Sequence, residues 1–319
     1  MKKLVNFLAS AALAVALLVW LARYLDTARL LETLRNSWGG WLLCAFMMMG
    51  VYQFLRGLRI RLFFPGANAP AEKLFGLMCV QGFLNNILPS WLGDAALVYL
   101  LKRWHGMDLY SGAASVVATR IADLSFILLM FAALTILAMD QAALPLLAIT
   151  AGMAAMIAAG LGFIAILARY GAEKRPAGAW AGRAWDAMQK FIQTLAAIRA
   201  DRTLWAPLAF YTAGMWLIQY FVFVALVRAL DHHLPLFTML GVYLIGFSEN
   251  LLPIKGVASL GTYETAWYVA LRIFGIDRST AVLLGFGSHA LMLSVISALG
   301  AVGLLALAIG GAGKQAGEN

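Results

Sequence analysis

The stretch Gly82-Phe83-Leu84-Asn85-Asn86-Ile87-Leu88-Pro89 decides the fold of this chain, together with the Gly93-Asp94 pair that follows it. It lies in strongly hydrophobic sequence, yet it contains two amides, a helix-breaking proline and a carboxylate. It recurs as Gly246-Phe247-Ser248-Glu249-Asn250-Leu251-Leu252-Pro253, and Gly261 and Glu264 then follow as the glycine and the acid. Interrupted hydrophobic segments at matching places in two halves of a membrane protein indicate its binding site.

A shorter element also occurs twice. Gly106-Met107-Asp108 is echoed by Gly275-Ile276-Asp277, and each copy precedes a long apolar run. The recurrence of several elements in the same order indicates an internal duplication.

The composition excludes a soluble domain. Hydrophobic residues make up 63% of the 319 residues and charged residues only 12%, whereas soluble domains are typically about 45–50% apolar. The net charge of +9 comes from basic residues in loops between apolar runs, where they set membrane orientation, so we expect no nucleic-acid partner. Cys44 and Cys79 lie inside apolar runs without metal or redox spacing. We therefore expect no metal and no cofactor.

Six apolar runs are long enough to cross a bilayer, which needs about 20 residues. The first is expected to be a transmembrane helix rather than a cleaved signal, because no small-residue cleavage site precedes Arg23. Two further stretches, 74–101 and 236–271, are too long for one crossing and carry glycines and polar residues at their middle. Each is predicted to be a re-entrant hairpin of two short helices joined at the proline. The six crossings are predicted at 4–22, 39–55, 111–138, 143–168, 205–227 and 280–310.

Loop charges predict the orientation. With Met1-Lys2-Lys3 in the cytoplasm, the basic residues after the second crossing (Arg56, Arg59, Arg61 and Lys73) and the basic segment 169–202 fall on the same side, as the positive-inside rule expects. Both termini are then cytoplasmic.

Three crossings separate the two hairpins, so the hairpins enter from opposite faces. This predicts an all-α polytopic protein with an inverted repeat, the architecture of many alternating-access carriers; the alternative is an old duplication without a surviving transport role. The predicted parts are repeat 1 (1–140), inverted repeat 2 (141–310, with an amphipathic segment at 170–204) and a flexible tail (311–319). The amphipathic segment either lies on the membrane surface or packs on the cytoplasmic end of the bundle.

Ionisable groups at membrane depth cost about 2.5–3.5 kcal/mol each on the insertion scale, so they are candidates for function. Arg120 and Asp123 lie three positions apart on one helix face and can pair, either to bind substrate or as a purely structural ion pair. His289 takes the place of Arg120 when the halves are aligned on Gly106 and Gly275.

The hairpins supply the other candidates. A half-helix that starts near the midplane points its free N–H groups at an anion, glycines permit close approach, and amides bond without a buried charge. Asp94 and Glu264 either contact the substrate or cap helix N-termini. The candidate substrate-binding residues are Asn85, Asn86, Gly93, Asp94, Arg120, Asp123, Glu249, Asn250, Lys255, Gly261, Glu264 and His289.

Catalytic motifs are absent from the sequence. It contains neither a G-x-S-x-G elbow nor an H-E-x-x-H zinc motif. We therefore expect no enzyme and name no catalytic residue.

The chain resembles the flippase-like transmembrane domain of the lysylphosphatidylglycerol synthase family. The matching elements are Leu88-Pro89 with Gly93-Asp94, Arg120-x-x-Asp123, and Leu252-Pro253-Ile254 with Gly261-x-x-Glu264. It departs from the family pattern at Leu97 and Thr119, where arginine and glutamate are usual, and in its second hairpin, which lacks a compact glycine run. Bifunctional members carry an aminoacyl-transferase domain after the membrane domain; this sequence shows none before Asn319, so lysine transfer is not expected.

The resemblance and the predicted architecture favour a lipid translocase in the cytoplasmic membrane, with an anionic headgroup of phospholipid or polyprenyl-phosphate type as substrate. The alternative is a non-transporting membrane subunit that supports an envelope lipid- or glycan-modifying enzyme, and a third hypothesis is a membrane enzyme acting on a lipid head. The expected partners are the lipid itself and either a second copy of the chain or an envelope-biosynthesis enzyme.

Overall fold

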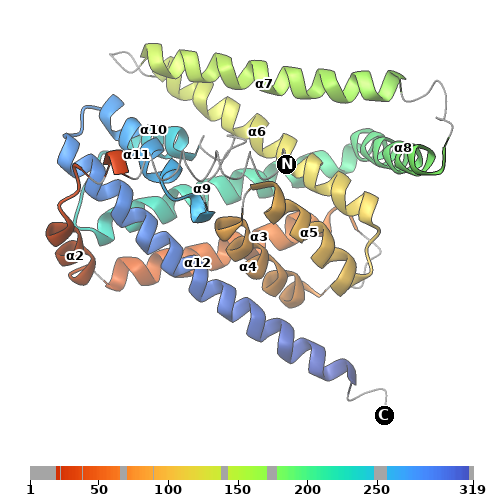
Figure 1. The fold of residues 1–319 in the computed structure, drawn as a ribbon, viewed down its shortest axis with the longest axis horizontal. Helices are drawn as coiled ribbons and strands as arrows, with labels where there is room; N and C mark the ends of the chain where they lie inside the picture. The colour runs from red at the N-terminus through yellow and green to blue at the C-terminus, as the bar shows by residue number, and fades with distance from the viewer. Residues whose placement is uncertain are drawn as a thin grey trace. The chain divides into compact units, whose positions relative to one another are not determined.

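The computed structural model describes residues 19–315 except 22, 38, 65–69, 89, 138–142, 171–177 and 248–256. Every regular element in these residues is helical, which confirms the all-α prediction (Figure 1). The crossing predicted at 4–22 lies largely outside the described residues. Four of the described helices are long and apolar enough to cross a membrane: Gly39–Arg61, Leu109–Leu137, Arg202–Ala229 and Arg278–Ile309. The chain is therefore a multi-pass membrane protein.

The helices belong to two compact units, each built from several stretches of the chain. Unit 1 comprises Met1–Gly57, Pro70–Ala96 and Met215–Asn319, and unit 2 comprises Leu58–Ala69 and Leu97–Gly214. Unit 1 holds α2 (Thr27–Arg35), most of α3 (Gly39–Arg61), α4 (Ala71–Ile87), the start of α5 (Ser90–His105), the end of α9 (Trp205–Ala229), α10 (Leu236–Phe247), η3 (Val257–Ser259), α11 (Thr262–Ile273) and α12 (Arg278–Gln315). Unit 2 holds the other ends of α3, α5 and α9, with α6 (Leu109–Leu137), α7 (Ala143–Tyr170), α8 (Ala179–Ala200) and η1 (Arg202–Leu204).

The first proline ends α4 as its chemistry requires. Leu88 has an extended backbone (φ −85, ψ 152), the conformation that a following proline imposes, and α5 begins at Ser90. The chain then reverses direction: Gln81 Nε2 of α4 donates a hydrogen bond to the carbonyl of Gly93 in α5 at 3.4 Å, so the two helices lie side by side. α4 and α5 therefore form a helical hairpin.

The second repeat also forms a hairpin. Gly241 of α10 faces the Phe274 ring just after α11, and Gly246 faces Trp267 of α11, so the two helices run antiparallel. Between them the backbone turns through positive φ at Ala258 (54°), Ser259 (55°) and Gly261 (83°). Positive φ is strained for a residue with a Cβ, so the first two of these angles mark a turn held by its surroundings.

The repeated Gly-x-Asp element has the same local structure in both places. Gly106 and Gly275 each have positive φ, 65° and 79°, which glycine adopts without strain. Asp108 accepts hydrogen bonds from the backbone N–H groups of Tyr110 and Ser111 at 3.1 and 3.2 Å, and Asp277 accepts one from Thr280 at 2.9 Å. Each aspartate thus caps the long helix that follows.

In unit 1, α12 packs against both α4 and α11, and η3 lies against α4. Glycines permit the contact with α4: a Cβ on Gly303 would lie 2.6 Å from the Gly76 carbonyl oxygen, and one on Gly300 2.8 Å from Phe83 Cβ. α12 continues to Gln315 and so includes the first part of the tail predicted at 311–319, because no proline interrupts the helix there.

In unit 2, α6 packs against α7 and α8. Thr135 of α6 and Thr150 of α7 are hydrogen-bonded at 3.2 Å, and Lys190 of α8 lies over the Tyr110 ring, 5.5 Å from its centroid. The predicted amphipathic segment therefore forms α8, which lies against the helices of its own unit.

Candidate functional site

A buried polar cluster lies beside the first hairpin. Gln53 of α3 and Gln81 of α4 are only 3% and 0% exposed. Arg56 Nη1 donates to Gln53 Oε1 at 2.8 Å, and its Nη2 donates to Gln81 Oε1. The second amide in turn donates to Gly93 of the hairpin. The Arg56 guanidinium is thus connected to the turn between α4 and α5 through the Gln81 amide.

The structure gives Gly93 a packing role. A Cβ at this position would lie 2.8 Å from the Cα and 3.0 Å from the Cβ of Asn85, so only glycine lets α5 approach α4 this closely. The space where we expected substrate is filled by Asn85. Its Oδ1 is buried and has no hydrogen-bond partner among the described residues. Asn86 donates to the Gly82 carbonyl of its own helix at 2.9 Å, and Asp94 is half-buried.

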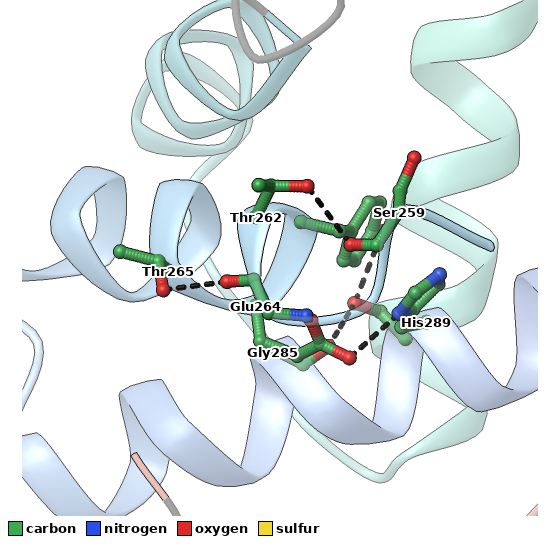
Figure 2. Close-up of polar contacts among 9 residues, drawn as sticks. Ser259, Thr262, Glu264, Thr265, Gly285 and His289 are labelled. Carbon is green, nitrogen blue, oxygen red and sulfur yellow. Dashed lines mark hydrogen bonds and ion pairs between the residues drawn. The ribbon is translucent and has the colours of Figure 1, made fainter. Parts of the chain in front are cut away.

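Beside the second hairpin lies a buried carboxylate–imidazole pair. Glu264 Oε1 accepts a hydrogen bond from His289 Nδ1 at 2.7 Å, and the two side chains are 2% and 4% exposed. Figure 2 shows them pointing toward each other from α11 and α12. The second carboxylate oxygen, Oε2, accepts from the Gly261 N–H at 2.7 Å. Glu264 therefore takes the capping role for α11 and binds histidine as well.

Aromatic and hydroxyl groups hold this pair in place. The Tyr263 ring stacks on His289 with 4.2 Å between ring centroids, and the Tyr263 hydroxyl lies 3.3 Å from Ser288 Oγ. Tyr263 also stacks on Trp267, which is almost fully buried. The imidazole plane and its Nδ1 are consequently fixed relative to α11.

The pair lies deep within a membrane-crossing helix. At about 1.5 Å per residue, His289 is about 16 Å along α12 from Arg278, and the hydrocarbon core of a bilayer is about 30 Å thick. α12 is apolar over Arg278–Ile309. His289 therefore lies inside the apolar span and not at its end, and ionisable groups within such spans are rare and are candidates for function.

Unit 2 contains a different buried ion pair. Arg59 of α3 bonds Asp123 of α6 with both terminal nitrogens, at 2.5 and 3.1 Å, and its Nη1 also donates to Thr212 of α9 at 3.2 Å. Arg59 is 6% exposed, whereas Arg120 is exposed. The sequence predicts that Arg120 can pair with Asp123, and the structure shows Arg59 as a partner of this carboxylate. The sequence placed Arg59 in a loop, whereas α3 extends to Arg61 and brings Arg59 into the helical interior.

The twelve predicted site residues thus fall into separate groups. The structure joins Glu264 with His289 and Gly261, and it places Asn85 against Gly93. Glu249, Asn250 and Lys255 lie outside the described residues. The prediction missed Gln53, Arg56, Gln81 and Arg59, although polar residues inside or at the end of an apolar run were a signal for them.

Metal binding has no support in the part of the chain that the structure describes. No three His, Cys, Asp or Glu side chains gather there as a metal ion would need.

Comparison with known proteins adds the family. No curated protein and no solved structure matches the chain. The family model described as the lysylphosphatidylglycerol synthase TM region matches residues 7–300, nearly the whole sequence and both hairpins. The chain belongs to the family of lysylphosphatidylglycerol synthase transmembrane regions.

Proposed function

We propose that this protein is a lipid translocase of the cytoplasmic membrane. It moves an anionic headgroup, of phospholipid or polyprenyl-phosphate type, between the leaflets while the acyl chains stay in the bilayer. Membership of a lipid-related membrane family supports the substrate class. The observation that carries the proposal is the polar cluster at the first hairpin, in which the half-buried Arg56 bonds the buried side chains of Gln53 and Gln81.

The packing of α4 on α3 supports a position of this hairpin within the membrane span. Gly57 faces Leu74 and Gly82 faces Gln53, so α4 runs antiparallel to α3. The end of α4 at Ile87 then comes level with the middle of α3, about residue 48 by antiparallel counting from Gln53. The chain turns back at that level, as expected for a hairpin that enters and leaves on one side.

The chemistry of the cluster suits an anionic headgroup. Arg56 supplies a permanent positive charge with planar donors that match phosphate oxygens. Two of its partners, Gln53 and Gln81, are neutral amides, which can rotate away without leaving a buried charge of their own. The second hairpin lies in the same unit, and its η3 segment packs on α4. A headgroup at the cluster would therefore lie close to both repeats, as alternating access requires.

Replacement of Arg56 tests this function. We expect Arg56→Gln to slow the movement of fluorescent phosphatidylglycerol between leaflets of proteoliposomes by about tenfold or more, because a charge-assisted hydrogen bond contributes about 1.5–3 kcal/mol and each 1.4 kcal/mol is about a factor of ten. Lipid in the outer leaflet is measured by dithionite quenching. Arg56→Lys keeps the charge and should recover part of the rate.

Arg61→Gln is the matched control, because Arg61 is exposed at the end of the same helix. It should move lipid at the parental rate. If the parental protein moves no lipid, or if Arg56→Gln moves it as fast as Arg61→Gln while both remain folded, the translocase proposal fails. A non-transporting subunit of an envelope-modifying enzyme then becomes the better hypothesis.

A further inference from the structure

We propose that the Glu264–His289 pair binds one proton in each transport cycle and so couples lipid movement to the proton gradient. This inference rests on the proposed translocase function and assigns its driving ion. His289 Nδ1 donates to Glu264 Oε1, so the lone pair of the neutral imidazole lies at Nε2. One proton adds to Nε2 from water on one side of the membrane and later leaves Nε2 to water on the other, with no transfer of electrons.

The contacts of Glu264 give the two proton states different net charges. The carboxylate accepts hydrogen bonds from His289 and from the Gly261 N–H, and it lies at the positive end of the α11 helix dipole. With neutral imidazole the pair carries one negative charge; with protonated imidazole it is neutral. An unbalanced charge is expensive in the bilayer interior, so the enclosed arrangement seen here, 2% and 4% exposed, suits the proton-loaded pair.

The surroundings of the pair carry no other charge in direct contact among the described residues. α11 contributes Tyr263, and α12 contributes Ser288. α4 meets α12 farther along, where Cys79 lies at Gly303, and the other titratable side chains of α4 are Glu72 and Lys73 in its first turn. α10 contributes Tyr243, which lies among Trp216, Phe223 and Phe247 rather than at the imidazole. α2 also packs on α12, and its charged residues Arg29, Glu32 and Arg35 are exposed.

Protonation can act directly on the second hairpin. Glu264 holds the first turn of α11 through Gly261, and the two residues with strained positive φ, Ala258 and Ser259, lie immediately before it. A change in the charge of the pair alters the strength of the hydrogen bond that Glu264 accepts from the Gly261 N–H. Because η3 lies against α4, the same change reaches the helix that carries Gln81 of the lipid cluster.

Proton binding is tested first without transport. The protein labelled with ¹⁵N-histidine in lipid nanodiscs contains four histidines, and the signals lost in His289→Gln identify this residue. We expect the His289 ring nitrogens to change from the neutral to the protonated pattern between high and low pH, and Glu264→Gln to displace that change along the pH axis. A His289 spectrum that stays the same at every pH at which the protein remains folded overturns the proton site.

Coupling is tested in the proteoliposomes with fluorescent phosphatidylglycerol, with the membrane potential held at zero by valinomycin and equal potassium. For one proton per lipid, a gradient of one pH unit should shift the ratio of labelled lipid between the leaflets by about tenfold. His289→Gln should abolish the shift, whereas the exposed His233→Gln should keep it.

The two proposals fail in different ways. If the parental protein equilibrates lipid but the pH gradient produces no shift, proton coupling is overturned and the translocase stands. If no lipid moves at all, the translocase proposal fails and the coupling role fails with it, whatever the spectrum of His289 shows about proton binding.

Discussion

The two buried ion pairs, Arg59–Asp123 in unit 2 and Glu264–His289 in unit 1, look alike by distance and burial but differ in chemistry. Both join two helices at 2.5–2.7 Å with side chains at most 15% exposed. Arg59 cannot lose its proton in a protein, and it grips Asp123 with a planar fork. Histidine can change its charge near neutral pH. Short distance and burial alone therefore do not identify a functional ion pair. What differs is whether one partner can lose its charge: Arg59–Asp123 is a permanently charged pair, and Glu264–His289 is a titratable pair.

The largest expected effect on stability comes from breaking the permanently charged Arg59–Asp123 pair. Asp123→Asn leaves the permanent charge of Arg59 buried, so we expect a loss of about 3 kcal/mol in the free energy of unfolding, the lower end of the range for a broken buried pair because Asp123 is 15% exposed. Urea or thermal unfolding in detergent measures it. The double variant Arg59→Met/Asp123→Asn should recover most of the loss, and a single variant as stable as the parent would contradict the prediction.

The partner of Asp123 shows what could not be predicted from the sequence. Helical spacing offers only neighbours three or four positions away, such as Arg120, whereas Arg59, which also bonds Asp123, lies 64 positions away. The apolar run ends at Leu55, so Arg56 and Arg59 were assigned to a loop. The long aliphatic stem of arginine allows the helix to continue into the interior while the charge finds partners on other helices.

Local features of the fold were predictable because their causes are local. Leu88-Pro89 ends α4 by its own sterics, and the Gly-x-Asp elements turn and cap the chain within a few residues. Glu264 and His289 could each be selected as ionisable groups in apolar sequence, but their contact joins two helices 25 positions apart. Packing on α12 decides that contact, and no single-sequence pattern encodes it.

The second prediction concerns the titratable pair. Glu264→Gln keeps the size of the side chain but removes the charge, and the histidine left behind can become neutral. We therefore expect a smaller loss than for Asp123→Asn, about 1–2 kcal/mol, which includes the weakened N-terminal cap of α11. The same unfolding experiment compares the two variants. If Glu264→Gln proves more destabilising than Asp123→Asn, the distinction between a permanently charged pair and a titratable pair is not supported.

The smallest effect concerns an exposed carboxylate outside the membrane span. The backbone N–H of Thr280, assisted by the Ser279 hydroxyl, holds the pKa of Asp277 well below its ordinary value of 3.8. A lowered folded-state pKa stabilises the fold at pH values above the ordinary value, and this stability is lost as the pH falls through the folded-state pKa. Asp277→Ala should lower stability by about 1 kcal/mol at neutral pH.

In acid the Asp277→Ala variant and the parent should converge. Asp108→Ala, which removes the equivalent cap of α6, should also lower stability at neutral pH, by about 1 kcal/mol. A difference that persists unchanged in acid would show that Asp277 acts through packing rather than through its charge.

The single continuous helix α12 packs against both hairpins, through α4 of the first and α11 of the second. It meets the second hairpin through Gly285 and His289 and the first through Gly300 and Gly303, which are separated by about 27 Å of helix from end to end. At Gly303 the helix lies directly against the Gly76 carbonyl and the Cys79 side chain of α4, so the two helices are closely packed at this point. Because α12 is one continuous helix, a displacement of one hairpin would be transmitted along it to the other.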